Sequence, residues 1–321
     1  MNADSNTNQT NLAETDLQDL SLHVNAGLLM PGVDENHKIR SMLNAAAKKQ
    51  LGDRLHLDSE LPNWPAEYFN LTDAAVFQNA NASEKQTILD LCGQAIVEEA
   101  LLIEKCGMAF GVKMSALSEC VEERMFYNLM AAEEAIHYHQ VRQFLPNDGM
   151  KVQPNPFHHL LANLIENGDR NSLVFIIQVV LEGWGLSHYK QLADNCLSEA
   201  FSFELREILK DESRHHGTGV IFSKEREFSS ASCDFIVSVL KDFLQMIQVG
   251  PQAILGAVES VLGELPKNEK LALFNELDGE AKSTEKLNTL RDLMLQNGGA
   301  KIVERLDALK SFTPYPAEEC L

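Results

Sequence analysis

The chain has 321 residues, 45% of them hydrophobic, and a formal net charge of −20. This length allows one large domain or two ordinary domains with a sizeable core. A balance this acidic argues against nucleic acid or an anionic membrane as the main partner, because both bind basic surfaces.

No segment reads as a membrane span or a secretory signal. The longest apolar run, 173–181, is too short to cross a bilayer and contains Gln178. The first 37 residues hold no Lys or Arg and no apolar stretch typical of a signal peptide. The six cysteines form no C-x-x-C pair, which argues against a zinc ribbon or a dithiol redox motif. We therefore expect a cytoplasmic protein with reduced thiols.

The N-terminal part begins with a polar, acidic stretch. Residues 1–36 are predicted to be a mostly disordered tail with one short helix at about 16–23. A helix is expected at 37–51, followed by a proline-punctuated stretch. Ser83, with Gln86 three residues later, resembles a capping box and predicts a long helix that ends near 112.

The remaining sequence predicts further helices and no strand of useful length. The turn signal Pro146-Asn147-Asp148-Gly149 ends the second long helix, Ser229 or Ser230 caps the fifth, and Gly250-Pro251 interrupts it. The expected helices after the first long one are 115–144, 156–166, 171–195, 198–227, 229–249, 269–277, 281–296 and 300–311. We therefore predict an all-α chain with a helical domain at 37–250, a core bundle at about 84–227 and a helical C-terminal appendage at 251–321.

One pattern occurs twice at matching spacing. Glu134 and His137 form an E-x-x-H motif, and Glu212 and His215 form a second one. Glu and His three positions apart project from one face of a helix. Each motif also has a glutamate thirty residues upstream, and the six candidate metal ligands are Glu104, Glu134, His137, Glu182, Glu212 and His215. Four carboxylates and two imidazoles from four helices are the ligand set of a two-iron or two-manganese site in a helix bundle.

The residues before the motif glutamates extend this pattern. Glu133 precedes Glu134 and Asp211 precedes Glu212. A metal-bound imidazole usually donates its second N–H to a carboxylate. In a pseudo-symmetric bundle we expect Asp211 to reach His137 and Glu133 to reach His215; the alternative is that both are ordinary surface acids.

The donor types favour particular metals. Hard carboxylates with two nitrogen donors suit iron or manganese better than zinc. Two iron ions are the expected cofactor, and a mixed manganese–iron pair fits the same donors. Such a pair can reduce O2 and oxidise a substrate held in a dry pocket.

The motifs resemble those of the ferritin-like di-iron carboxylate superfamily. The stretch 211–215, DESRH, is similar to the second motif of bacterial multicomponent monooxygenase hydroxylases and acyl-carrier-protein desaturases. The stretch 133–137, EEAIH, is similar to their first motif, with Ile136 where an arginine is often found. The resemblance covers about 84–227 and implies a ferritin-like four-helix bundle, with additional N- and C-terminal helices, that holds two metal ions on the six residues named above.

Departures from the family patterns narrow the expected activity. Proteins resembling the radical subunit of ribonucleotide reductase carry a tyrosine one turn after the motif histidine, where this chain has Val141 and Gly219. Arylamine N-oxygenases carry an extra histidine where this chain has Ile208. The lack of a C-x-x-C pair disfavours a rubrerythrin-type peroxidase. An acyl-carrier protein is a less natural substrate carrier, because it is acidic and this acidic chain would need a local basic patch to bind it.

Small residues near the ligands are candidates for a substrate pocket. A glycine inside a helix costs about 1 kcal/mol relative to alanine. Glycines near the candidate ligands could leave volume for a substrate or permit a π-bulge in the helix. The alternative is that they allow close packing between helices. Gln178, one turn before Glu182, is either a polar pocket contact or a buried amide bonded to a neighbouring helix. The pocket candidates are Ala100, Gly107, Gln178 and Gly185.

These observations favour an enzyme, a non-haem di-iron oxygenase or oxidase. The expected reaction is hydroxylation, N-oxygenation, desaturation or oxidative cleavage of a small organic substrate with O2. It calls for an electron donor such as a ferredoxin or reductase, and a homodimer is compatible with it. Two alternatives stay open: a ferroxidase or iron-handling protein, and a non-catalytic scaffold that holds metal.

Overall fold

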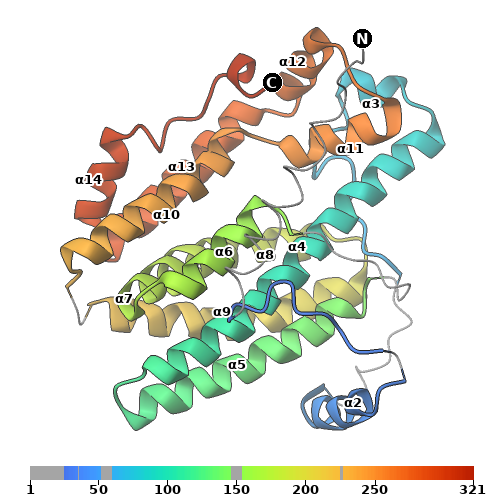
Figure 1. The fold of residues 1–321 in the computed structure, drawn as a ribbon. Helices are drawn as coiled ribbons and strands as arrows, with labels where there is room; N and C mark the ends of the chain where they lie inside the picture. Colours follow the sequence, from blue (N-terminus) through green and yellow to red (C-terminus); the bar gives the residue numbers. More distant parts are fainter. Residues whose placement is uncertain (1–24, 35, 52–59, 146–153, 225–226) are drawn as a thin grey trace, which may run out of the picture.

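Four long helices run alongside one another at the centre of the molecule (Figure 1). The structure is a computed structural model that describes residues 25–34, 36–51, 60–145, 154–224 and 227–321. The first two are α4 (Ala82–Leu117) and α5 (Val121–Arg142). The third is one continuous helix that consists of α7 (Arg170–Leu173), a π-helical segment (Val174–Glu182) and α8 (Gly183–Asn195). The fourth is α9 (Glu199–Lys224). Helix α4 packs along α5, and α9 packs along the π segment and α8. Every regular element in these ranges is helical, which confirms the all-α prediction, and the packing is consistent with a four-helix bundle.

The N-cap of the long helix α4 lies two residues before the predicted cap. The Asn81 side chain accepts a hydrogen bond from the Glu84 backbone N–H at 3.0 Å, and the Glu84 carboxylate accepts one from the Asn81 N–H at 2.8 Å. This is a capping box in which Asn replaces Ser. The prediction of Ser83 and Gln86 was therefore wrong, because an equivalent pair lies two residues upstream.

The third long helix contains the π geometry that its glycines led us to consider. Nine residues, Val174–Glu182, are π-helical, and seven apolar side chains among them are buried. Burying each apolar side chain of this size contributes about 1.5–3 kcal/mol. Packing therefore holds a backbone form that is rare in isolation and that often marks functional sites. The segment ends at Glu182, one of the predicted ligands.

The N-terminal part lies against the bundle. In the segment predicted to be a disordered tail, Ala26 and Leu28 are buried, and the Lys105 ammonium donates to the Leu28 carbonyl at 2.9 Å. Residues 1–24, including the helix expected at 16–23, lie outside the described residues. Next come α2 (Lys38–Leu51), which contacts α5, and the short α3 (Ala75–Asn79).

The remaining helices pack against the bundle along α4 and along the third long helix. They are α6 (Pro156–Asn167), α10 (Ser230–Gln248, capped by Ser229), α11 (Gln252–Leu262), α12 (Lys267–Glu276), α13 (Gly279–Gln296), α14 (Ala300–Ala308) and a 3₁₀ turn at Ala317–Glu319. Helix α11 was not predicted. Gly250, at φ 73°, turns the chain, and a new helix starts directly after Pro251.

Two hydrophobic clusters hold these elements together. One packs the π segment against α10 and α13, with Phe175 and Leu290 at its centre. The other packs α4 against α8, α9 and α11 around Trp64 and Phe201. In the part of the chain that the structure describes, no helix is long and apolar enough to span a membrane.

Candidate metal centre

Six acidic and imidazole side chains converge in the middle of the bundle. Helix α4 supplies one, α5 two, the π segment one and α9 two, so all four long helices contribute. Glu104, Glu134, His137 and His215 are buried, and Glu182 and Glu212 are partly buried. These are the six residues singled out as ligands from the duplicated motif.

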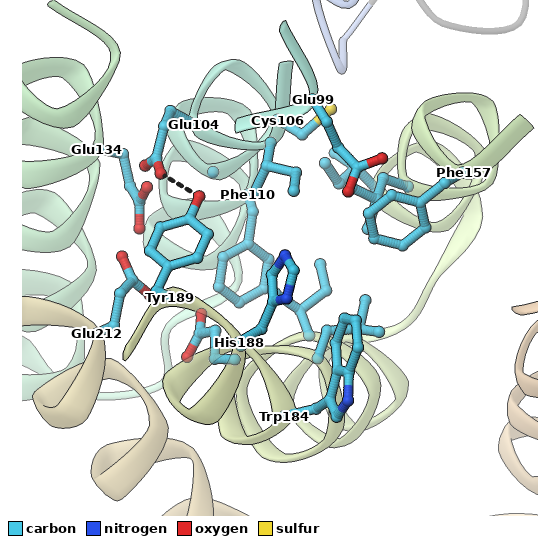
Figure 2. A pocket seen from close by; sticks show the side chains of 18 residues that line it. Glu99, Glu104, Cys106, Phe110, Glu134, Phe157, Trp184, His188, Tyr189 and Glu212 are labelled. Atoms are coloured by element: carbon cyan, nitrogen blue, oxygen red, sulfur yellow. Dashed lines mark hydrogen bonds between the residues drawn. The ribbon is translucent and has the colours of Figure 1, made fainter. Parts of the chain in front are cut away.

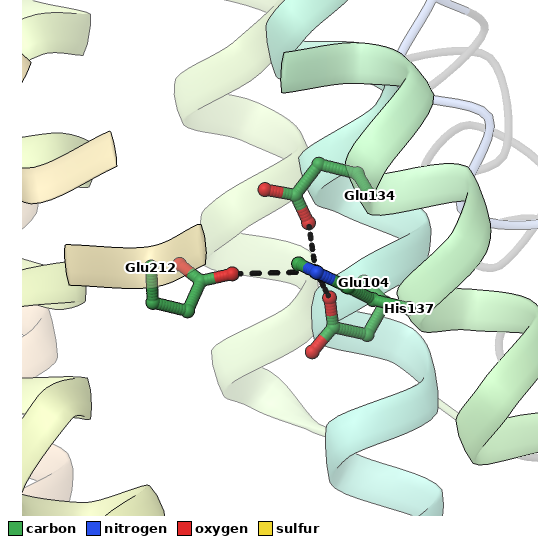
Figure 3. Close-up of side chains that lie close together, drawn as sticks. All are labelled: Glu104, Glu134, His137 and Glu212. Carbon is green, nitrogen blue, oxygen red and sulfur yellow. Dashed lines mark ion pairs between the residues drawn. The ribbon is translucent and has the colours of Figure 1, made fainter. Parts of the chain in front are cut away.

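The first group surrounds His137 (Figure 3). Its Nδ1 atom lies 3.3 Å from Glu104 Oε2 and 3.4 Å from Glu212 Oε1. Glu134 Oε2 is 3.8 Å away. Three carboxylates from three helices therefore point at one imidazole nitrogen.

The second group surrounds His215. Its Nδ1 atom lies 3.2 Å from Glu134 Oε1 and 3.5 Å from Glu212 Oε2. Glu182 offers a ligand atom to the same group. Glu134 and Glu212 thus present one oxygen to each histidine, while Glu104 contributes to the first group and Glu182 to the second. In a helix bundle, such a cluster of Glu and His side chains could hold metal ions.

The far side of each imidazole is held by a carboxylate from the opposite helix. His137 Nε2 lies 3.2 Å from Asp211 Oδ2, and His215 Nε2 lies 2.9 Å from Glu133 Oε2. Both contacts were expected from the positions of these acids in the sequence. They leave each Nδ1 directed at the carboxylate cluster, as in metal sites where an outer carboxylate fixes the imidazole tautomer.

One arginine joins these two outer carboxylates. An Arg214 guanidinium nitrogen donates to Glu133 Oε1 at 2.7 Å and to Asp211 Oδ1 at 2.8 Å. Ile136, which stands where the first motif often has an arginine, instead packs against Ala47 of α2. A single arginine therefore serves both halves of the site.

The titration of the cluster reflects its burial and its crowding. Burial raises the pKa of Glu104 to about 8, although His137 opposes the change. Burial and the Glu212 charge raise the pKa of Glu182 well above its usual range. Burial also disfavours the charged form of His215, but Glu133, Glu134 and Glu212 outweigh it and raise its pKa to about 12. Protons therefore occupy the cluster when no other cation does.

Three buried atoms identify what the cluster lacks. His137 Nδ1, His215 Nδ1 and Glu182 Oε2 have no hydrogen-bond partner among the described residues. Each unsatisfied buried polar group costs roughly 1–3 kcal/mol. All three belong to the two groups, and four carboxylates balance the charge of two divalent ions. The donor set therefore fits metal, and this buried group of Glu and His residues could hold metal ions.

A tyrosine that no sequence motif singles out also contacts the cluster. The Tyr189 hydroxyl donates to Glu104 Oε1 at 2.9 Å, and its ring is buried (Figure 2). Burial, followed by the Glu104 charge, raises its pKa well above the usual range. Its position seven residues after Glu182, two helical turns along, was the available signal. A phenol is thus present at the site although Val141 occupies the position where the radical-type pattern has tyrosine.

A mostly apolar cavity of about 110 Å³ adjoins the cluster. Four of the candidate ligands, Glu104, Glu134, Glu182 and Glu212, form part of its wall. Apolar side chains from α4, α6 and the third long helix form most of the rest, among them Ile103, Phe110, Leu161, Ile177 and Leu181.

Two of the four predicted pocket residues line this cavity, and two do not. Gly107 and Gly185 lie in its wall. Ala100 packs in the hydrophobic cluster around Trp64 instead. Gln178 is fully buried: its amide donates to the His215 carbonyl at 3.0 Å and accepts from the Tyr127 hydroxyl at 2.8 Å. The alternative of a buried, satisfied amide is therefore the correct one for Gln178.

The two glycines in the wall have different roles. A Cβ at Gly107 would lie 2.4 Å from Glu134 Oε2, whereas a Cβ at Gly185 would meet nothing within 4 Å. Gly107 therefore makes room for a shared carboxylate, and Gly185 leaves open cavity volume. Close helix packing explains Gly111, where a Cβ would lie 2.8 Å from Ala131 Cβ.

Comparison of the chain with family models, with curated proteins and with solved structures finds no match. The helical fold and the buried Glu and His groups are nevertheless compatible with a di-iron carboxylate site.

The metal-free protein is expected to lose stability as the pH rises. The folded-state pKa of His215 is about 12 against an ordinary 6.5, and that of Glu104 is about 8 against 4.5. Both are raised, so their contribution is complete below the unfolded values and is lost as the pH climbs through the folded values. The melting temperature without metal should fall by several degrees between pH 6 and pH 9, and the added stabilisation by Mn(II) should grow, because metal replaces protons.

Thermal melts with and without Mn(II) measure both trends. The E122Q variant, at an exposed position outside the cluster, is the control, and its metal-free profile should match that of wild type over the same range. A wild-type melting temperature that is constant or higher at pH 9 without metal would contradict this account of the cluster.

Replacing an outer carboxylate is expected to weaken metal binding without removing a ligand. Asp211→Asn keeps the shape of the side chain but removes the charge facing His137, so Mn(II) affinity should fall about 10- to 100-fold. Arg214→Ala should cost less, since its side chain is 53% exposed. Mn(II) titration followed by electron paramagnetic resonance reports both affinities. Ser213→Ala on the same helix is the control, and equal affinity for Asp211→Asn and wild type would show that the contact does not matter.

Proposed function

We propose that this chain is a non-haem di-iron oxygenase or oxidase that uses O2 to oxidise a small organic substrate. The observation that carries the proposal is the position of the two-group cluster in the wall of an apolar cavity. A site that only stores or oxidises iron has no need of an apolar chamber beside it. An enzyme that acts on an organic molecule does, because the chamber binds the substrate and keeps water away.

The donor set supports iron as the metal. Four carboxylates and two imidazole nitrogens are hard or intermediate donors, and no cysteine lies in either group. Such donors suit iron and manganese, so a mixed manganese–iron pair is the alternative loading. We assign Glu104 and His137 to one ion, Glu182 and His215 to the other, and Glu134 and Glu212 to both.

The side chains around the ions have distinct tasks in this proposal. When bound, the metal pair supplies the redox chemistry that activates O2. The Tyr189 hydroxyl holds Glu104 by its hydrogen bond and fixes the orientation of that carboxylate. The outer carboxylates Asp211 and Glu133 set both imidazole tautomers. The apolar cavity wall keeps the substrate beside the four glutamates.

Electrons for a monooxygenase-type reaction have to come from outside the chain. A ferredoxin or a reductase is the class of partner that we propose. The histidine side of the site lies near the surface at Arg214, which is half exposed and pairs with both outer carboxylates. We propose that the electron donor docks on this side.

Anaerobic reconstitution with Fe(II), followed by exposure to O2, tests the proposal. We expect about two irons per chain and O2 consumption that speeds up when an organic substrate is added, with an oxidised product in the mixture. Uptake of many irons per chain, with O2 consumption that no organic compound changes, would instead indicate a ferroxidase. Two bound irons without any O2 consumption, with or without a chemical reductant, would indicate a non-catalytic metal-bound scaffold.

A further inference from the structure

The cavity carries two polar groups outside the carboxylate cluster. Glu99 and His188 both line it, together with the rings of Phe157 and Trp184. Figure 2 shows Glu99, Phe157 and Trp184 across the cavity from Glu134 and Glu212. Neither Glu99 nor His188 has a role in the metal site described above.

Glu99 is a carboxylate with little to balance it. Its one hydrogen bond among the described residues comes from Asn155 Nδ2, at a long 3.4 Å. The Lys286 ammonium is near enough to lower its pKa but forms no ion pair with it in the described part of the chain. Burial prevails and raises the pKa of this carboxyl. A cation inside the cavity would supply the missing partner.

His188 offers a neutral acceptor in the same cavity. Burial, followed by the Lys286 charge, lowers its pKa to about 4, so the imidazole is uncharged at neutral pH. The ring stacks on Trp184 with centroids 5.3 Å apart and planes 5° from parallel. A neutral imidazole keeps one nitrogen free to accept a hydrogen bond, and aromatic faces such as those of Trp184 and Phe157 attract cations.

The charge of the cavity wall selects against anions. Five glutamates line it, and two divalent ions would neutralise only four of them. Glu99 is then the one carboxylate of the wall that the two ions leave uncompensated, and the nearest described cation, Lys286, does not line the cavity. An organic carboxylate or phosphate would meet this charge without any cationic side chain among the lining residues.

We propose that the cavity binds a small apolar primary amine, with the ammonium group held by Glu99 and His188 and the hydrocarbon body directed toward the carboxylate cluster. The proposal deepens the proposed function, on which it rests for any reaction, and it places oxidation on carbon at the end away from the amine. A 150 Å³ cavity can hold the six carbons of benzene, so about 110 Å³ accommodates a body of roughly four carbons.

Binding of three matched probes tests this inference without turnover. The full chain, metal-free and loaded with redox-inert Zn(II), is titrated with n-butylamine, butan-1-ol and butanoate by calorimetry. Butylamine should bind at least about tenfold more tightly than butanol, and butanoate should bind most weakly, because a hydrogen bond to a charged group is stronger than a neutral one.

Two variants assign the preference to Glu99. Glu99→Gln should weaken butylamine binding by about tenfold or more and leave butanol binding within about twofold of wild type. Glu98→Gln makes the same change of net charge on the adjacent residue, which does not line the cavity, and should change nothing. Equal affinity for amine and alcohol, an amine preference that survives Glu99→Gln, or no binding of any probe would overturn the inference. Failure to load Zn(II) would count against the metal site alone, since the dependence on Glu99 is measured in the metal-free protein as well.

Discussion

Glu134→Ala is expected to empty both metal positions, so that bound metal falls from about two ions per chain to well below one. Glu134 is the central carboxylate of the cluster, with one oxygen 3.2 Å from His215 Nδ1 and the other 3.8 Å from His137 Nδ1. Its loss removes a donor from each position and leaves the two imidazoles with one shared carboxylate, Glu212. Anaerobic equilibration with Fe(II), desalting and elemental analysis measure the change.

Two comparisons make this result specific. Glu104 faces only His137, so Glu104→Ala should leave about one ion per chain. Glu122→Ala changes the net charge equally on the same helix as Glu134, at an exposed position, and should retain about two. If Glu134→Ala kept more metal than Glu104→Ala, Glu134 would not be the shared ligand. Circular dichroism confirms that each variant is folded.

Gly107→Ala is expected to abolish tight metal binding while the protein stays folded. The new Cβ would lie 2.4 Å from Glu134 Oε2 and 2.7 Å from its carboxyl carbon, so the carboxylate must move. The backbone need not move, because the contact is with the end of a side chain. Metal affinity should fall by about 100-fold or more, the upper range for disturbed ligand positioning. Alanine also favours the helix by about 1 kcal/mol, so the metal-free melting temperature should hold or rise.

Gly185→Ala is the matched control, in the wall of the same cavity. Its Cβ would meet nothing within 4 Å, so metal binding should equal that of wild type and only cavity volume should shrink. Titration with Mn(II) and a metal-free thermal melt on both variants provide the data. Wild-type affinity in Gly107→Ala would mean that Glu134 has another productive position and that the glycine serves packing alone.

The sequence predicted that these six side chains converge because its signal is local and repeated. Two E-x-x-H motifs with glutamates at equal distance could come together only if four helices packed side by side, and the helical periodicity indicated those helices. The cross-helix contacts of Asp211 and Glu133 followed from the same pseudo-symmetry. Each of these predictions needed only the helical repeat and the chemistry of carboxylate and imidazole.

The sequence did not predict features that depend on how each helix is rotated about its axis against its neighbours. Ala100 and Gly107 share a helix face by spacing, yet only Gly107 reaches the cavity. The extent of the π segment, which shifts the register of the third long helix before α8, was not readable either. Tyr189 was not predicted because it lies two turns beyond Glu182 and its hydroxyl reaches Glu104 on a different helix, a contact that depends on how the two helices pack.

The central claim is that this bundle holds two metal ions between His137 and His215. Crystals grown with Mn(II), examined by anomalous diffraction at the manganese absorption edge, test it most directly. The account predicts two anomalous peaks about 3.5–4 Å apart, one beside each histidine Nδ1, with Glu134 and Glu212 in contact with both. A single peak, or peaks only on the acidic surface with Nδ1 of both histidines unliganded, would contradict it.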